Sequence, residues 1–315
     1  MRSGEKLDLG YSGRWTYGHL VLAVPVGSAA AALAALGAPW WAWLPIAILA
    51  GWLFAGFLVM RLGVRMNEIP DLDVTGFADG DAVRVLDVGC GPGTITADIA
   101  GRVHPGRVVA LDPAPDVVAA AAQVVGAAGG TNARVVVGDV YADPVADGVE
   151  GPFDVVHAHQ VLQHVPDPVG ALRRMRDLCA QDGVVGARDA DYAAFTWFPQ
   201  VPALDEWLAL YRRLARAGGG EPDAGRRLLS WARAAGFSHV EASASVWCYA
   251  TPEARAWWGG MWADRVVASS IAEQAVASGA ATRADLERMR AGWQEWAAAE
   301  DGWFLVPHGE VVCRP

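Results

Sequence analysis

A run of apolar residues that ends in three alternate glycines, VRVLDVGCGPG at residues 83–93, constrains the fold of this chain more than any other segment. Four further short apolar runs rich in β-branched residues follow it, at 107–111, 133–138, 153–158 and 183–188. The segments between them, 94–103, 114–129 and 167–181, have the composition and length of helices. Strands that are apolar throughout and separated by such helices are typical of a parallel sheet covered on both faces. The sequence therefore predicts an α/β fold in which Gly89, Gly91 and Gly93 lie at the carboxyl end of the first strand.

Acidic residues stand at the ends of the second and third predicted strands. Asp112 ends the second strand about 20 residues after the glycines, where a carboxylate can hydrogen-bond both hydroxyls of a ribose. Asp139 and Val140 follow the third strand, where a carboxylate can accept a hydrogen bond from the exocyclic amine of adenine. Glycine lets the backbone turn tightly and lets a ligand approach it closely. Because ligands of such sheets bind at the carboxyl ends of the strands, these three strand ends predict a nucleoside pocket.

Two classes of cofactor use a pocket of this kind, and the residues around the glycines distinguish them. The dinucleotide pattern G-x-G-x-x-G requires a glycine at position 94, where this chain has Thr94. In a dinucleotide site the carboxylate of Asp87 would lie close to the negative pyrophosphate, which is unfavourable. In a site for S-adenosylmethionine (SAM) it would lie close to the cationic amino acid part of the cofactor, which is favourable. Lys6 is the only lysine, so the Tyr-x-x-x-Lys pair of short-chain reductases is absent. These residues favour SAM over a nicotinamide cofactor.

The charged residues, cysteines and histidines disfavour other functions. The formal net charge is −10 and Lys and Arg do not cluster, so we expect no nucleic-acid partner. The four cysteines are scattered without a C-x-x-C pair, which favours reduced thiols in a cytosol over a disulfide framework. His157, His159 and His164 lack a recognised metal-ligand spacing, so we expect no metal.

The ordered set of motifs resembles the class I SAM-dependent methyltransferases. The motifs are LDVGCGPG (86–93), LDPAPD (111–116), GDV (138–140), FDVVHAHQVLQHVPDP (153–168) and GVVGARDADY (183–192). They are similar to the small-molecule branch that includes the ubiquinone and menaquinone biosynthesis methyltransferases, over residues 80–315. The resemblance implies a Rossmann-like, seven-stranded, mostly parallel sheet that residues 236–245 and 302–313 close as an antiparallel pair.

The same resemblance implies roles for individual residues. The methionine part of SAM would be surrounded by Asp87, Gly89, Cys90, Gly91 and Gly93. Asp112 would hold the ribose, Asp139 and Val140 the adenine, and His157 would line the cofactor. Methyl transfer from a sulfonium needs mainly alignment and exclusion of water. A base helps only if the acceptor is a phenol, a hydroxyl or an acidic carbon, and His159 is our candidate for it. Asp189, Asp191, Tyr192 and His164 are the other titratable groups at this end of the sheet, and the resemblance gives His164 a structural place at a helix start.

Residues 1–66 differ from the rest of the chain. No charged residue occurs from Leu20 to Met60, and this run divides into apolar stretches at 20–38 and 40–60. Each has about the 20 residues that a membrane-spanning helix needs. Basic residues flank the pair, so the positive-inside rule predicts an apolar helical hairpin with both ends cytoplasmic. The alternative is a buried helical pair or a dimer interface. We expect this hairpin to precede a cytoplasmic methyltransferase domain at 67–315, with a cofactor half at 80–191 and a cap half at 192–315.

The cap half is rich in tryptophan, with ten of the fifteen at or after Trp197. The densest cluster, AWWGGMW at 256–262, is either helix packing against the sheet or the wall of an apolar pocket. With a membrane hairpin, such a wall would suit a quinone-like, isoprenoid or polyketide acceptor. The alternative to an enzyme is a noncatalytic SAM-binding or membrane-scaffold protein, because the hairpin leaves little room for the family's usual N-terminal lid.

Overall fold

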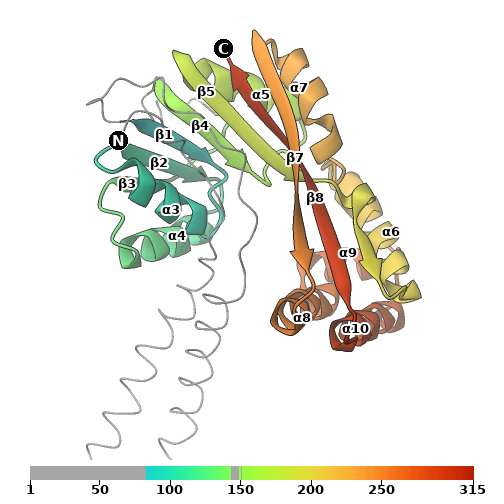
Figure 1. Ribbon diagram of the computed structural model, residues 1–315. Coiled ribbons are helices and arrows are strands. Elements are labelled where there is room, and N and C mark those ends of the chain that lie inside the picture. Colours follow the sequence, from blue (N-terminus) through green and yellow to red (C-terminus); the bar gives the residue numbers. More distant parts are fainter. Residues whose placement is uncertain (1–82, 143–148, 150) are drawn as a thin grey trace, which may run out of the picture.

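The computed structural model describes residues 83–142, 149 and 151–315. These residues form a sheet in the order β3-β2-β1-β4-β5-β8-β6, with β7 paired to β8 (Figure 1). The strands are β1 (Arg84–Val88), β2 (Arg107–Asp112), β3 (Ala133–Val137), β4 (Phe153–His159), β5 (Cys179–Ala190), β6 (Thr196–Phe198), β7 (His239–Tyr249) and β8 (Trp303–Arg314). The helices are α3 (Thr94–Val103), α4 (Pro115–Ala127), α5 (Pro168–Leu178), α6 (Pro202–Ala217), α7 (Leu228–Ala235), α8 (Pro252–Ala268), α9 (Ser270–Ala277) and α10 (Arg283–Ala298), with short 3₁₀ turns η1 (Tyr192–Ala194) and η2 (Gly225–Arg227).

Seven of the strands form the mixed, mostly parallel sheet that the sequence predicts. β1 pairs in parallel with β2 and β4, and the parallel pairs β2–β3 and β4–β5 extend the sheet on either side. β8 runs antiparallel to both β5 and β7, which confirms the predicted closing pair. The eighth strand is β6, only three residues long. Phe304 of β8 pairs with Trp197 of β6 and with Tyr249 of β7, so β6 continues the edge of β8 that β5 occupies.

Helices cover both faces of the parallel part because its strands are apolar on both sides. Ile99 and Ala100 of α3 pack against Val85 and Val155, while α4 brings Ala121 onto the same face. The opposite face is covered by α5 and α7, whose buried side chains pack with residues of β4, β5 and β8. The three central βα connections therefore deliver their loops to one edge of the sheet, the carboxyl ends of β1, β2 and β4.

A second core lies around the far half of the β7–β8 pair, where α6, α8, α9 and α10 gather (Figure 1). Trp293, Trp296 and Phe304 are fully buried at its centre. Trp258 and Trp262, from the tryptophan cluster at 256–262, are buried in the same core, as the packing interpretation expects, whereas Trp257 is only partly buried at its edge. α10 begins with a capping box, in which the carboxylate of Asp285 accepts from the backbone N–H of Thr282 at 2.8 Å.

The predicted apolar stretches at 20–38 and 40–60 lie outside the described residues. Within 83–142, 149 and 151–315, no helix combines the length and the apolar character that crossing a membrane requires.

Candidate functional site

The glycine-rich turn after β1 depends on glycine at each of its three positions. Gly89, Gly91 and Gly93 have φ angles of 64°, 52° and 78°, in the left-handed region that other residues seldom adopt. A Cβ on Gly93 would lie 2.9 Å from the backbone of Ala121, so this glycine also allows α3 and α4 to pack closely. A Cβ on Gly91 would meet nothing within 4 Å. The turn is therefore closed by packing at Gly93 and open at Gly91.

Asp112 lies beside this turn, as the sequence predicts. Its carboxylate accepts hydrogen bonds from the backbone N–H of Gly91 at 3.2 Å and of Ala114 at 3.0 Å. Its own carbonyl accepts from the N–H of Gly138 at 3.0 Å, which ties the end of β3 to the end of β2. The half-buried carboxylate therefore lies at the edge of the space that Gly91 leaves open.

Asp87 is held from two sides beneath the turn. One carboxylate oxygen accepts from the hydroxyl of Thr96 at 2.6 Å, and the other lies 2.9 Å from Nδ1 of His157. Both Asp87 and His157 are 2% exposed. Nε2 of His157 is buried and has no hydrogen-bond partner among the described residues. Thr96 is a positioning residue that the sequence analysis missed, although its place on the first turn of α3 could have indicated it.

The remaining predicted cofactor residues lie along the same edge. Cys90 is buried, and burial together with the charges of Asp87 and Asp112 raises the pKa of its thiol to about 12. It is therefore a protonated, unreactive side chain at neutral pH. Asp139 is exposed and accepts a hydrogen bond from the backbone N–H of Tyr141 at 3.0 Å, whereas Val140 is buried. The ends of β1, β2, β3 and β4 thus bring all the predicted cofactor residues to one edge of the sheet.

His159 lies two residues beyond His157 on β4, in an aromatic and basic environment. Its ring centroid is 6.4 Å from that of His157, 5.9 Å from that of Trp247 and 6.3 Å from that of His308. Burial, and then the charge of Arg188, lower the pKa of His159 well below its ordinary value. The ring is therefore neutral at pH 7 and would take up a proton only from an acidic group.

A polar network at the end of β4 involves residues that the sequence analysis did not single out. Gln160 has a φ of 55°, a left-handed conformation that is uncommon for a residue other than glycine. Its side-chain Nε2 lies 3.1 Å from Nε2 of His308, and its Oε1 accepts from Gln163 at 2.9 Å. Because the amide nitrogen of Gln160 can only donate, Nε2 of His308 accepts this hydrogen bond. Burial lowers the pKa of His308 well below its usual range, which agrees with a neutral, accepting ring. The strained backbone of Gln160 was not predictable from its residue type.

The two aspartates at the carboxyl end of β5, Asp189 within the strand and Asp191 just after it, have other partners. Asp189 is fully buried and accepts from the backbone N–H groups of Leu162 and Gln163, at 3.3 and 3.1 Å. Burial raises its pKa to about 7, although these two hydrogen bonds and Arg188 act in the opposite direction. Asp191 pairs with Nε of Arg226 at 2.6 Å. Asp189 thus anchors the loop after β4, and Asp191 anchors η2.

Tyr192 and His164 complete the titratable residues named from the sequence. The ring of Tyr192 is buried and stacks at 4.4 Å on Phe195 and at 4.4 Å on Tyr211. Burial raises its pKa well above the ordinary value, so the phenol stays protonated. His164 lies in the turn between β4 and α5. In the part of the chain that the structure describes, no group of three His, Cys, Asp or Glu side chains is arranged to hold a metal ion.

Comparison with known proteins shows which family this chain resembles. A family model described as "Methyltransferase domain" matches residues 86–185. An uncharacterised methyltransferase of Schizosaccharomyces pombe is 31% identical over 239 residues, which are 73% of this chain and 84% of that protein. The ubiquinone biosynthesis O-methyltransferase of Pseudomonas aeruginosa is 31% identical over 102 residues, covering 32% of this chain and 42% of that protein. The crystal structure of the YcgJ protein of Bacillus subtilis matches 76% of this chain and 95% of its own, at 18% identity and a TM-score of 0.47. The chain belongs to the class I SAM-dependent methyltransferases.

The residues at the strand ends fit the cofactor of this class. A Cβ at Gly91 would extend into open space where a ligand can approach the backbone. A carboxylate, Asp112, stands beside that space, and a buried ring nitrogen of His157 is without a partner among the described residues. When bound, SAM supplies a methyl group activated by a positive sulfur. The tasks left to the chain are to bind, to align the acceptor and to exclude water.

Proposed function

We propose that the chain transfers the methyl group of SAM to a small acceptor that is apolar or aromatic, of the quinone, isoprenoid or polyketide type. The observation that carries this proposal is the aromatic core that begins where β5 ends. Tyr192 lies two residues after the end of β5 and stacks on Tyr211 of α6, and both pack in one core with tryptophans of α8 and α10. Most of these rings pack against one another, and the partly buried Trp257 and Met261 at the edge of this core are apolar side chains that a flat or lipophilic ligand can contact. The partial match to the ubiquinone biosynthesis O-methyltransferase supports the same class of acceptor.

We assign the cofactor contacts as the resemblance implies. Asp87, Gly89, Cys90, Gly91 and Gly93 surround the methionine part of SAM. Asp112 binds the ribose. Asp139 and Val140 contact the adenine, and His157 lines the cofactor. The hydrogen bond from Gly91 to Asp112 and the pair of Asp87 with His157 support this assignment, because they join the glycine turn to its neighbouring strand ends.

His159 is the proposed general base for an acceptor with an acidic O–H or C–H group. Its low pKa suits an acidic donor, since proton transfer is efficient when the two pKa values are close. We expect His159→Ala to lower the transfer rate by about a hundredfold, the usual contribution of a positioned base. His239→Ala, which removes an exposed histidine on β7, is the matched control. A rate for His159→Ala within about threefold of the wild type would exclude this role.

The N-terminal region is assigned from sequence alone. The charge-free run Leu20–Met60 supports a membrane hairpin in a region of residues 1–66, ahead of a cytoplasmic methyltransferase domain at 67–315 with halves at 80–191 and 192–315. A membrane anchor would bring the enzyme to lipophilic acceptors. Recovery of all the protein in the soluble fraction of a lysate, at low salt and without detergent, would exclude the anchor.

The proposed activity is tested by incubating the full chain with SAM and a panel of quinols, isoprenoid phenols and aromatic polyketides. Formation of S-adenosylhomocysteine that depends on the acceptor is the expected result. Binding of SAM without turnover across the panel would favour a noncatalytic SAM-binding protein. Methylation of small polar acceptors alone would contradict the proposed acceptor class.

A further inference from the structure

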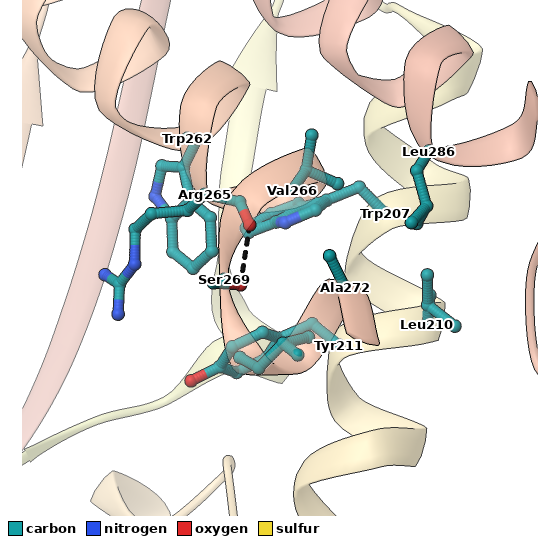
Figure 2. Close-up of a pocket in the computed structure, with 10 residues that line it drawn as sticks. Trp207, Leu210, Tyr211, Trp262, Arg265, Val266, Ser269, Ala272 and Leu286 are labelled. Carbon is teal, nitrogen blue, oxygen red and sulfur yellow. Dashed lines mark hydrogen bonds between the residues drawn. The ribbon is translucent and has the colours of Figure 1, made fainter. Parts of the chain in front are cut away.

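The hollow in the aromatic core of the cap half is too small for an acceptor. It lies between α6, α8 and α9, and its walls include Trp207, Tyr211 and Trp262 (Figure 2). The interior has room for about one water molecule. An acceptor must therefore be bound by side chains outside this hollow. Gln160, which follows β4 directly, lies at the edge of the sheet where the predicted cofactor residues gather.

The backbone of Gln160 is strained. In the part of the chain that the structure describes, Gln160 is the only residue other than glycine with a positive φ, at 55°. Glycine would adopt this left-handed conformation without strain, so a glutamine side chain here comes at a cost in stability. Strained residues of this kind cluster at active sites and ligand-binding sites, where the surrounding structure holds them in place.

Hydrogen bonds to β5 hold this strained backbone in place. The N–H of Gln160 donates to the carbonyl of Arg188 at 2.7 Å. Two and three residues further on, the N–H groups of Leu162 and Gln163 donate to the buried carboxyl of Asp189, at 3.3 and 3.1 Å. The turn after β4 is therefore fixed to β5, and the direction in which the Gln160 side chain leaves the backbone is fixed with it.

The side-chain amide of Gln160 has hydrogen-bonding capacity that the chain does not use. Its Nε2 donates to Nε2 of His308 at 3.1 Å, and its Oε1 accepts from Nε2 of Gln163 at 2.9 Å. A glutamine amide can donate two hydrogen bonds and accept two, so one N–H and one lone pair remain. Oε1 of Gln163 is buried and has no hydrogen-bond partner among the described residues either. Gln160 itself is partly exposed, so a ligand can reach its amide.

Gln160 lies beside the proposed cofactor site. β4 pairs in parallel with β1, with Ala158 opposite Val88, so the two strands end at the same level. The residue after Gln160 contacts the glycine-rich turn, since a Cβ on Gly89 would lie 2.6 Å from a methyl of Val161. A ligand group bound to the amide of Gln160 would therefore lie next to the turn at which we propose that the cofactor binds.

We infer that Gln160 is a specificity-determining residue, whose side-chain amide binds a hydroxyl group of the acceptor. A hydroxyl both donates and accepts, so it matches the N–H and the lone pair that the amide has left. The acceptor is then a phenol, an enol or an alcohol. This inference rests on the proposed function, because it places the acceptor beside a cofactor at the glycine-rich turn.

The groups around Gln160 favour a neutral hydroxyl over an acidic group. The rings of His308 and His159 have centroids 6.3 Å apart, and burial keeps both rings neutral at pH 7. The guanidinium of Arg188 is paired with Glu310 at 2.9 Å. These side chains leave no unpaired positive charge for an anion. A site that hydrogen-bonds a hydroxyl also discriminates against an analogue without one, because its polar groups then lose their partner.

The inference is tested with two probes that share a naphthalene frame and differ by one hydroxyl, 2-naphthol and naphthalene. Binding of each probe to the full chain, with S-adenosylhomocysteine present, is measured by equilibrium dialysis against a protein-free blank. We expect the wild type to bind 2-naphthol at least about fivefold more tightly than naphthalene, as for one hydrogen bond. Gln160→Leu keeps the length of the side chain without its amide. It should reduce this preference to within about twofold and leave the affinity for naphthalene unchanged.

Two further variants separate the amide from the backbone and from glutamine in general. Gln160→Gly relieves the left-handed backbone and should lose the preference as well, because it too lacks the amide. Gln274→Leu, the matched control, removes an exposed glutamine from α9 and should keep the full preference.

Three results would overturn the inference. A preference for 2-naphthol that Gln160→Leu retains would show that the amide does not bind the hydroxyl. An equal loss of both probes in Gln160→Leu would show that the side chain acts through packing. A wild type that binds 2-naphthol no better than naphthalene, or binds neither, would show that no hydroxyl site exists here. SAM is titrated into the same proteins, so the proposed function is tested separately: wild-type protein that fails to bind SAM would remove that function, whatever the probes show.

Discussion

The buried carboxyl of Asp189 makes a quantitative prediction about stability. Burial raises its pKa from 3.8 to about 7, so the folded chain keeps the proton between these values and the unfolded chain does not. The free energy of unfolding must therefore fall as the pH rises through this range. Three pKa units correspond to about 4 kcal/mol in total, of which roughly 3 kcal/mol is lost between pH 5 and pH 8.

Asp189→Asn is the perturbation that isolates this effect, because the amide cannot titrate and keeps one oxygen to accept from the loop after β4. His159 and His308 act with the opposite sign. Their pKa values are lowered in the fold, so they make stability rise with pH up to about 6.5. These histidines are present in both proteins, so the difference between wild type and variant removes their contribution.

The assay is urea unfolding at pH 5, 6, 7 and 8, for the wild type and for Asp189→Asn. We expect the wild type to be the more stable protein at pH 5 and to lose about 3 kcal/mol relative to the variant by pH 8. If the free energies of unfolding of the two proteins changed in parallel from pH 5 to pH 8, the prediction would be wrong, because Asp189 would then be ionised in the folded chain throughout.

Two further predictions concern the glycine turn and the aromatic core. Gly93→Ala should lower the free energy of unfolding by about 2–3 kcal/mol and weaken SAM binding, because its Cβ would lie 2.9 Å from the Ala121 backbone. Gly91→Ala, where the space is open, should lower the free energy of unfolding by only about 1–2 kcal/mol, the cost of a left-handed conformation for a residue other than glycine. Equal losses in thermal unfolding would contradict this account of the turn. Trp293→Ala should lower the free energy of unfolding in urea by about 3–5 kcal/mol, because the Trp293 side chain is fully buried. Trp303→Ala should lower it by less than half as much, because the Trp303 side chain is 37% exposed. A loss below about 1 kcal/mol at Trp293 would mean that the cap does not unfold with the sheet.

The central strands and helices were predictable because local signals agree there. An apolar strand, a turn and a helix with a buried face recur three times, and α3 begins and ends at the predicted residues, Thr94 and Val103. β6 was missed because three residues carry no period, and only the register of β8 makes a strand of Thr196–Phe198. β5 begins at Cys179, earlier than predicted. The start of this strand was missed because its polar residues interrupt the apolar pattern from which a strand is predicted.

The candidate site was predictable where it depends on strand ends. The contact between Gly91 and Asp112 follows from the alternation of strand and helix, since each strand delivers its last residue to the same edge. The buried pair of Arg188 with Glu310, at 2.9 Å, could not be predicted, because it joins residues far apart in sequence through the β5–β8 register. The contact of Gln160 with His308 depends likewise on the place of β8 in the sheet, which no local pattern specifies.

The most direct test of the cofactor site is a calorimetric titration of SAM into the full chain, alongside Asp112→Ala and, as a matched control, Asp116→Ala, which removes an exposed acid from the first turn of α4. We expect micromolar binding to the wild type and to the control, and binding at least about tenfold weaker in Asp112→Ala, as for one lost charge-assisted hydrogen bond. NAD should produce no binding heat. Binding of NAD in place of SAM, or SAM affinity that Asp112→Ala leaves unchanged, would contradict the account.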